Sequence, residues 1–92
     1  MNESDISNLK TLLDSLVFAS TKADAKPIYN KLNFKTSTLS GEIDQYSLDK
    51  LIEAISYAYS ASGQVNDKSH WQSNMERSWY VFEANVNREP QT

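Results

Sequence analysis

The residue types that carry most enzyme chemistry are scarce in this chain. It has one histidine, His70, and no cysteine, which excludes thiolate nucleophiles, disulfides and cysteine-based zinc or iron–sulfur sites. His70 stands beside Asp67 and Ser69 in the stretch DKSH, but a catalytic relay needs partners that separate elements bring together. Because Asp67 or Ser69 suits the N-cap of the last helix, we interpret His70 as a residue in its first turn, with no catalytic or metal-binding role.

Glu42 and Asp44, in the stretch GEIDQ, are the closest pair of carboxylates with a spacing that could serve acid–base chemistry. On a strand they would share a face, but no apolar run or basic residue beside them suits either to proton transfer. We interpret them as part of a solvated turn. The sequence also has no calcium-loop motif and no glycine-rich phosphate-binding loop. We therefore expect a protein that is not an enzyme and that holds no metal and no cofactor.

Composition predicts one folded domain over residues 1–92. A content of 39% hydrophobic and 23% charged residues is typical of a folded protein and not of a disordered tail. No apolar run approaches the roughly 18–20 residues of a membrane span, so we expect no membrane partner. The chain starts acidic and polar, unlike a secretory signal peptide, and we expect a cytoplasmic protein.

The charge pattern argues against direct binding to nucleic acid. The net charge is −3, and the lysines and arginines are dispersed among acids, whereas a nucleic-acid binder carries a basic stripe that neutralises phosphates. A helix-turn-helix made from the last two predicted helices would expose Arg77 and Arg88 against Glu76, Glu83 and Glu89. The sign of that face is wrong for contact with DNA.

Apolar periodicity predicts two amphipathic helices, over residues 4–20 and 47–62. We expect Ser4 and Ser47 to cap their N-termini, and Gly63 to end the second helix. At about 100° per residue, each helix gathers its apolar side chains on one face. The first stripe consists of Ile6, Leu9, Leu12, Leu13, Leu16 and Val17, and the second of Leu48, Leu51, Ile52, Ile55, Ala58 and Tyr59.

The middle of the chain is less regular. Asp24 as a cap and Pro27 in a first turn indicate a short helix of about two turns. The segment 33–46 is ambiguous, because Phe34, Thr36 and Thr38 alternate as in a strand, while an irregular connection or a helical turn fits equally well. The fold class we predict is a small all-α bundle of three main helices plus one short helix, with a possible minor β-hairpin or irregular segment at 33–46.

The last predicted helix, residues 67–89, concentrates aromatic residues. On a helical projection one narrow arc collects Trp71, Met75, Trp79, Phe82 and Val86, and we interpret this arc as core.

Three aromatic residues do not fit the core stripes of their helices. Tyr80 points away from the arc of the last helix, beside Arg77, and both Tyr57 and Phe18 lie off the stripes of theirs. Either the segment 24–46 folds over one or more of them, or they form a second apolar surface. We favour the second interpretation and predict that Tyr80, Tyr57, Phe18 and Arg77 bind a partner.

The function we expect from this surface is binding to another protein, alone or as a homodimer. An inhibitor, immunity factor, adaptor or small regulatory subunit would act in this way, through aromatic anchors surrounded by charged residues. The alternative is an acidic DNA mimic that antagonises a DNA-binding protein or nuclease. Its carboxylates would come from Glu3, Asp5, Asp14, Glu42, Asp44, Asp49, Glu53, Glu76 and Glu83.

Overall fold

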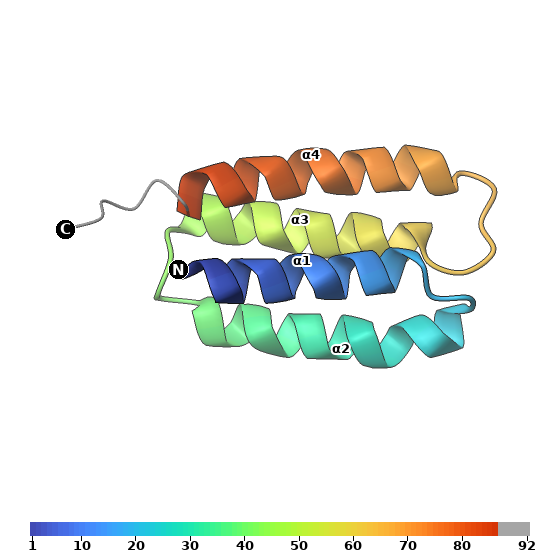
Figure 1. Cartoon of the computed structure of the whole chain (residues 1–92), viewed down its shortest axis with the longest axis horizontal. Helices are drawn as coiled ribbons and strands as arrows, with labels where there is room; N and C mark the ends of the chain where they lie inside the picture. Colours follow the sequence, from blue (N-terminus) through green and yellow to red (C-terminus); the bar gives the residue numbers. More distant parts are fainter. Residues whose placement is uncertain (87–92) are drawn as a thin grey trace.

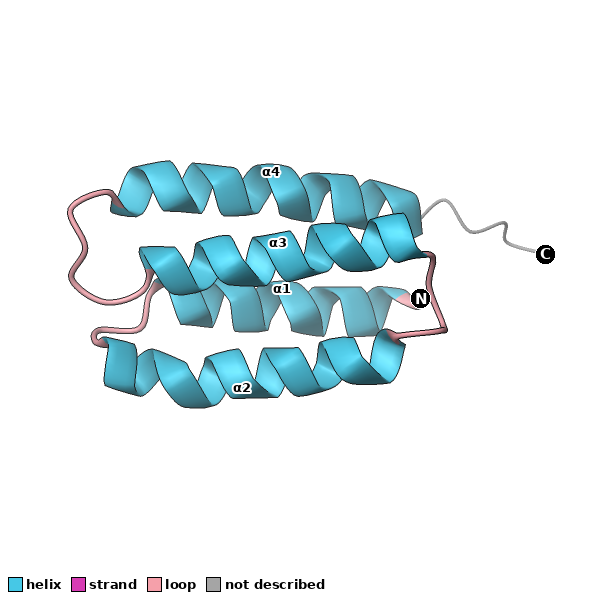
Figure 2. Ribbon diagram, turned by 180° about the vertical axis from the view of Figure 1, so that it is seen from behind, coloured by secondary structure: helices cyan, strands magenta, loops and turns pink. Residues whose placement is uncertain are grey.

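The computed structural model describes residues 1–86 and folds them into four helices. These are α1 (Glu3–Val17), α2 (Lys22–Leu39), α3 (Gln45–Ala61) and α4 (Lys68–Val86). Successive helices run in opposite directions, so short turns at the two ends of the bundle join them (Figure 1; Figure 2). The predicted all-α bundle is confirmed. The last three residues of the helix predicted at 67–89, and Pro90 beyond it, lie outside the described residues.

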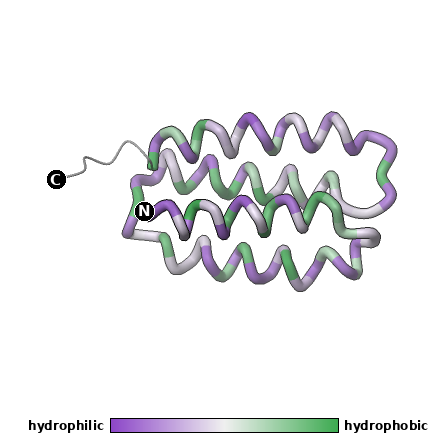
Figure 3. The backbone as a smooth tube through the Cα atoms, viewed as in Figure 1, coloured by the Kyte–Doolittle hydropathy of each residue, from purple (hydrophilic) through white to green (hydrophobic). Residues whose placement is uncertain are grey.

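Hydrophobic and hydrophilic residues alternate along each helix (Figure 3), and each helix contributes buried residues to the core. The stripe predicted for the first helix forms the core side of α1, with only Leu12 half-buried. No described helix combines the length and the apolar character that crossing a membrane requires. The buried core cluster consists of Ile6, Leu9, Leu13, Leu16, Val17, Ala25, Leu32, Leu51, Ala54, Ile55, Ala58, Ala61, Met75, Trp79, Phe82 and Val86.

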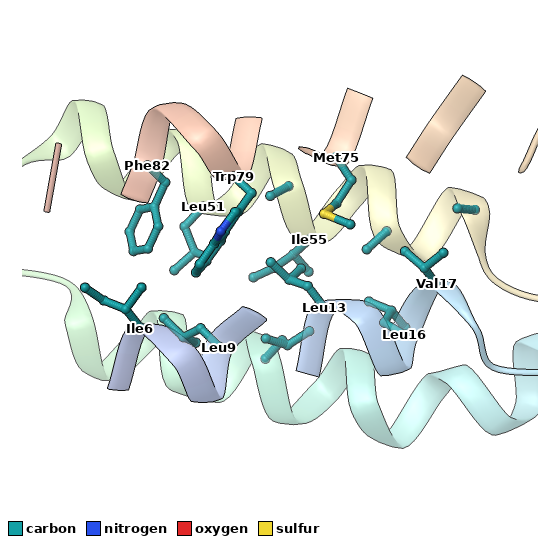
Figure 4. Packing of buried hydrophobic residues seen from close by; sticks show 14 of the residues in the cluster. Ile6, Leu9, Leu13, Leu16, Val17, Leu51, Ile55, Met75, Trp79 and Phe82 are labelled. Carbon is teal, nitrogen blue, oxygen red and sulfur yellow. The ribbon is translucent and has the colours of Figure 1, made fainter. Parts of the chain in front are cut away.

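Helix α3 contacts all three other helices, and its pairing with α4 is the most extensive. Ala54, Ala58 and Ala61 repeat at helical spacing and are fully buried. Small side chains let two helix axes approach closely, and buried residues of α3 and α4 belong to one core cluster. Trp79 and Phe82 pack there with their ring centroids 5.1 Å apart, close to side chains of α1 and α3 (Figure 4).

The prediction of a short helix followed by a strand or irregular segment is wrong for residues 33–39, because α2 extends from Lys22 to Leu39. Thr36 and Thr38, whose alternation suggested a strand, donate their hydroxyls to helix carbonyls, at 2.9 Å and 2.7 Å. Leu32 and Thr36 lie one turn apart and are both buried. Packing of this face against the bundle outweighs the strand preference of threonine.

Between α2 and α3, the predicted hairpin is reduced to an isolated bridge between Ser40 and Ile43. Gly41 provides the turn with a φ of 90°, which a residue without Cβ adopts at little cost. The turn is too short for a ladder of strands, and α3 begins directly after it.

The N-caps lie slightly upstream of the predicted ones. Asp44, and not Ser47, caps α3, and its carboxylate accepts hydrogen bonds from the Ser47 amide at 3.0 Å and the Ser47 hydroxyl at 2.7 Å. These bonds hold the pKa of Asp44 below its ordinary value. Asn2, and not Ser4, caps α1.

The N-terminus of α2 shows the same displacement. Thr21 caps this helix by accepting from the amide of Asp24 at 3.0 Å, so Asp24 is the third helical residue. Pro27 therefore lies inside the helix and not in its first turn. Proline has no backbone N–H, so one intrahelical hydrogen bond is lost at this position. The helix nevertheless continues, because its residues before and after Pro27 pack on the bundle.

At the end of the bundle where α1 and α3 finish, one lysine joins the C-termini of these two helices. The ammonium of Lys68 donates to the carbonyls of Val17 and Ala61 at 2.6 Å each, and to that of Gly63 at 3.2 Å. The last carbonyls of a helix have no intrahelical partner, and a cation there also interacts favourably with the helix dipole. The first residue of α4 thus ties the ends of α1 and α3 together.

A second lysine, Lys22, reinforces the same end of the bundle. Its ammonium donates to the carbonyl of Tyr59 and to the hydroxyl of Ser62, and lies 4.6 Å from the centroid of the Tyr59 ring. Burial lowers the pKa of Lys22, and the charge of nearby Lys68 lowers it further. The ring of Tyr59 in turn packs against Tyr29 of α2 with centroids 4.5 Å apart.

Replacing Phe82 with alanine should test the core of the α3–α4 pair. Phe82 is fully buried, and we expect Phe82→Ala to lower the free energy of unfolding by about 3–5 kcal/mol. Phe34→Ala is the matched control, because Phe34 is 71% exposed and its loss should change stability by less than about 0.5 kcal/mol. Urea denaturation followed by circular dichroism measures both values. Equal effects of the two substitutions would contradict this core.

Removing the ammonium of Lys68 should leave carbonyls of two helix ends without their partner. We expect Lys68→Ala to lower the free energy of unfolding by about 1–3 kcal/mol, the range for hydrogen bonds to charged groups. Lys31→Ala serves as control, since Lys31 is exposed on α2. Thermal and urea unfolding of both variants compare them directly. If Lys68→Ala is as stable as Lys31→Ala, the bridge between α1 and α3 contributes nothing.

Candidate protein-binding face

The outer side of α4 carries the most exposed aromatic side chain of the last helix. Tyr80 is 71% exposed, and the exposed Arg77 takes part in no ion pair within residues 1–86. Both residues line a shallow, wide-open groove on the surface of this single helix, together with Ser73, Glu76 and Val81. An aromatic ring and a guanidinium side by side are the residue types that most often dominate binding to proteins.

A second groove follows the junction of α3 and α4. Its volume is about 240 Å³, and its lining includes Tyr57 of α3 together with Arg77 and Val81 of α4. Because Arg77 and Val81 belong to both grooves, the two form one continuous surface. We call this surface the α4 face, defined by Tyr57, Ser73, Glu76, Arg77, Tyr80 and Val81.

Tyr57 is held in place by α4. Its ring stacks on Trp71 with centroids 6.1 Å apart and planes inclined by 24°, and it is half-buried against the core. Tyr57 is therefore off the apolar stripe of its helix, as the sequence indicates, but it does not project freely into solvent. It forms part of the floor of the second groove.

Polar contacts fix the rest of that floor. The hydroxyl of Ser78 donates to Glu53 at 2.9 Å across the helix pair, and Lys50 forms an ion pair with the same carboxylate at 3.4 Å. Lys50 also lies 5.6 Å from the centroid of the Tyr46 ring. The Ser78–Glu53 hydrogen bond thus joins the two helices beside this groove.

Where the α4 face borders α1, Lys10 neutralises part of the acidic charge. It lies 3.1 Å from Glu76 and 3.1 Å from Asp14. Burial by itself would lower the pKa of Lys10, but the hydrogen bonds and charges of Glu76 and Asp14 outweigh it and raise that pKa. Glu76 is thus oriented by α1, while Arg77 keeps its charge available to a partner.

Phe18 lies apart from the α4 face. It is the C-cap of α1 and 63% exposed, at the end of the bundle where Lys68 begins α4. Tyr80 follows Lys68 by twelve residues, roughly 18 Å along the helix. The structure therefore brings together Tyr57, Arg77 and Tyr80, and leaves Phe18 outside their surface.

The residues considered for chemistry have structural surroundings. His70 is exposed, with its Nε2 3.3 Å from the side-chain amide of Asn74 and its ring edge-on to Trp71. Asp44 is a helix cap, and Glu42 lies in the turn before it. Within residues 1–86, no three histidine, aspartate or glutamate side chains are grouped so that they could hold a metal ion.

Sequence reasoning missed Val81, which lines both grooves. On the helical projection it lies about 100° from Tyr80, away from both the core arc and the outer side. Its position beside Tyr57 depends on how α4 is rotated against α3, which the spacing of one helix does not reveal.

Comparison of the chain with family models, with curated proteins and with solved structures finds no match. The residues of the α4 face are therefore interpreted from their own geometry.

Stability measurements should separate the two tyrosines of the α4 face. Because Tyr57 is stacked on Trp71 and half-buried, we expect Tyr57→Ala to cost about 1–2 kcal/mol of unfolding free energy. Tyr80→Ala should change it by less than about 0.5 kcal/mol, since little of that ring is buried. Urea denaturation gives both values. A larger loss for Tyr80→Ala than for Tyr57→Ala would mean that Tyr80 contributes to the fold.

Proposed function

We propose that this chain is a non-catalytic protein-binding module that docks its partner on the α4 face. The observation that carries the proposal is the exposed ring of Tyr80 beside Arg77, which forms no ion pair within residues 1–86, over two grooves that share Arg77 and Val81. The packing of the four helices leaves Tyr80 exposed, and the side chain of Arg77 forms no hydrogen bond within residues 1–86. Such exposed anchors gain their contacts only when a partner covers them.

The mechanism would be steric. Tyr80 is a large ring with few rotatable bonds, so ordering it on binding costs little conformational entropy. Arg77 presents a planar fork of donors that suits a carboxylate of the partner. Both side chains stand on a helix that packs extensively on α3, which keeps the binding surface rigid. An inhibitor, immunity factor, adaptor or small regulatory subunit works in this way, by covering a surface of its target.

The arrangement of acids gives less support to DNA mimicry. A mimic needs many carboxylates that face outward and have no cation beside them. Here Asp14 and Glu76 share Lys10, and Glu53 is paired with Lys50. Asp44 serves the N-terminus of α3. Asp49 accepts a hydrogen bond from the side-chain amide of Gln45 at 2.8 Å. Five of the nine acids named for mimicry are therefore engaged inside the protein.

Affinity capture from host lysate tests the proposal. We expect the wild type to retain a protein partner at high salt, and the Tyr57→Ala/Tyr80→Ala variant to lose it. If one aromatic side chain contributes about 2 kcal/mol to the binding free energy, its loss makes the dissociation constant roughly 30-fold larger. Binding that depends on aromatic anchors persists when salt screens surface charges.

Phe34→Ala/Phe18→Ala is the matched control, because it removes two exposed rings that lie outside the α4 face. This control should retain the partner. Capture of DNA-binding proteins that wash off with salt and ignore both variants would favour mimicry. Retention of the same protein by wild type and by Tyr57→Ala/Tyr80→Ala at high salt would show that the α4 face is not the binding surface.

A further inference from the structure

The outer residues of α4 have a pattern that complements itself. Ser69, Ser73, Glu76, Tyr80 and Ala84 are exposed and recur at helical spacing along one side of the helix, with Arg77 beside them. A two-fold axis that passes between Glu76 and Arg77 would place an identical helix antiparallel to α4. Opposite residues under this axis are Glu76 and Arg77, Ser73 and Tyr80, Ser69 and Ala84, and Gln72 and Val81.

The charges of this pairing match. Each Glu76 would face the Arg77 of the second copy, so the axis creates two opposite-charge pairs at the centre of the contact. Lys10 already holds Glu76 at 3.1 Å, and the Glu76 side chain remains 47% exposed, which leaves room for a second cation. A parallel pairing would instead bring like charges together and align the two helix dipoles unfavourably.

The sizes of the side chains match as well. The ring of Tyr80 would lie opposite Ser73, one of the smallest side chains of the groove. Ser69 and Ala84, both small and exposed, would meet toward the ends, so the helix axes can approach. Large side chains opposite small ones are what lets two helices interlock.

From this complementarity we propose that the partner of the α4 face is a second copy of this chain, bound through an antiparallel, two-fold symmetric pairing of α4 with α4. The inference rests on the proposed function, because it names the occupant of the same surface. A contact between two single helices lies at the small end of protein interfaces, below about 1,200 Å² in total. The dimer therefore forms with increasing protein concentration.

Charge reversal combined with mixing tests the pairing. We expect the wild type to shift from monomer to dimer in sedimentation velocity as concentration rises, and Glu76→Arg alone or Arg77→Glu alone to remain monomeric. A mixture of these two variants should dimerise again, since each arginine pair then faces a glutamate pair. Lys31→Glu, on the exposed side of α2, is the control and should dimerise like the wild type. Circular dichroism confirms that each variant is folded.

Crosslinking tests the direction of the pairing independently. Because the chain has no native cysteine, Ser69→Cys and Ala84→Cys introduce single thiols. In the antiparallel dimer a short bismaleimide should join Ser69→Cys to Ala84→Cys in a mixture, but not Ser69→Cys to itself, because those two positions lie roughly 22 Å apart along the helices.

Three results would overturn the proposal: a wild type that stays monomeric at all concentrations, a mixture of charge variants that does not recover the dimer, or preferential Ser69→Cys self-crosslinking. The proposed function is judged separately, by whether capture of a different protein depends on Tyr57 and Tyr80. A monomeric wild type with such capture would retain the binding module and reject the dimer.

Discussion

The close packing of α4 against the alanine side of α3 is the interaction on which the rest of this structure depends. Ala54, Ala58 and Ala61 of α3 are fully buried, and Trp79 and Phe82 of α4 pack against each other with centroids 5.1 Å apart, so the two helices contribute small and large side chains to one core cluster. The same approach rotates α4 so that its remaining side faces outward. Both grooves of the α4 face follow from this rotation.

Polar contacts stabilise the ends of the helices. Asp44 fixes the start of α3 through Ser47, and Lys68 bonds the carbonyl ends of α1 and α3 to the start of α4. The chain has no disulfides, and these contacts help to stabilise the fold as a crosslink does in other small domains. The α4 face is therefore presented by helices whose ends cannot easily slide.

The proposed function and the proposed dimer use one surface. Tyr80 and Arg77 are both central to it, so a copy of the chain and a different protein would compete for the same side chains. Because of this competition, a higher concentration of the protein would leave a smaller fraction of its α4 face free for a different partner. Tyr57 lies on α3 and lines the groove between α3 and α4. A partner that contacts both helices would therefore touch Tyr57, whereas a partner that contacts α4 alone would not.

Hydrophobic spacing by itself determined the all-α class, most of the inward stripes of α1, α3 and α4, and the outward position of Tyr80 and Arg77, because each depends only on the 3.6-residue period within one helix. The spacing was wrong for Ile52, which it placed on the inward stripe of α3 and which is 47% exposed. Only the tertiary structure decided the length of α2, where burial of Leu32 and Thr36 overrides a strand-like alternation. It also decided that Tyr57 and Val81 join Tyr80 while Phe18 stays apart. Those positions depend on how helices rotate and stack against one another, and that is set by side chains far apart in the chain.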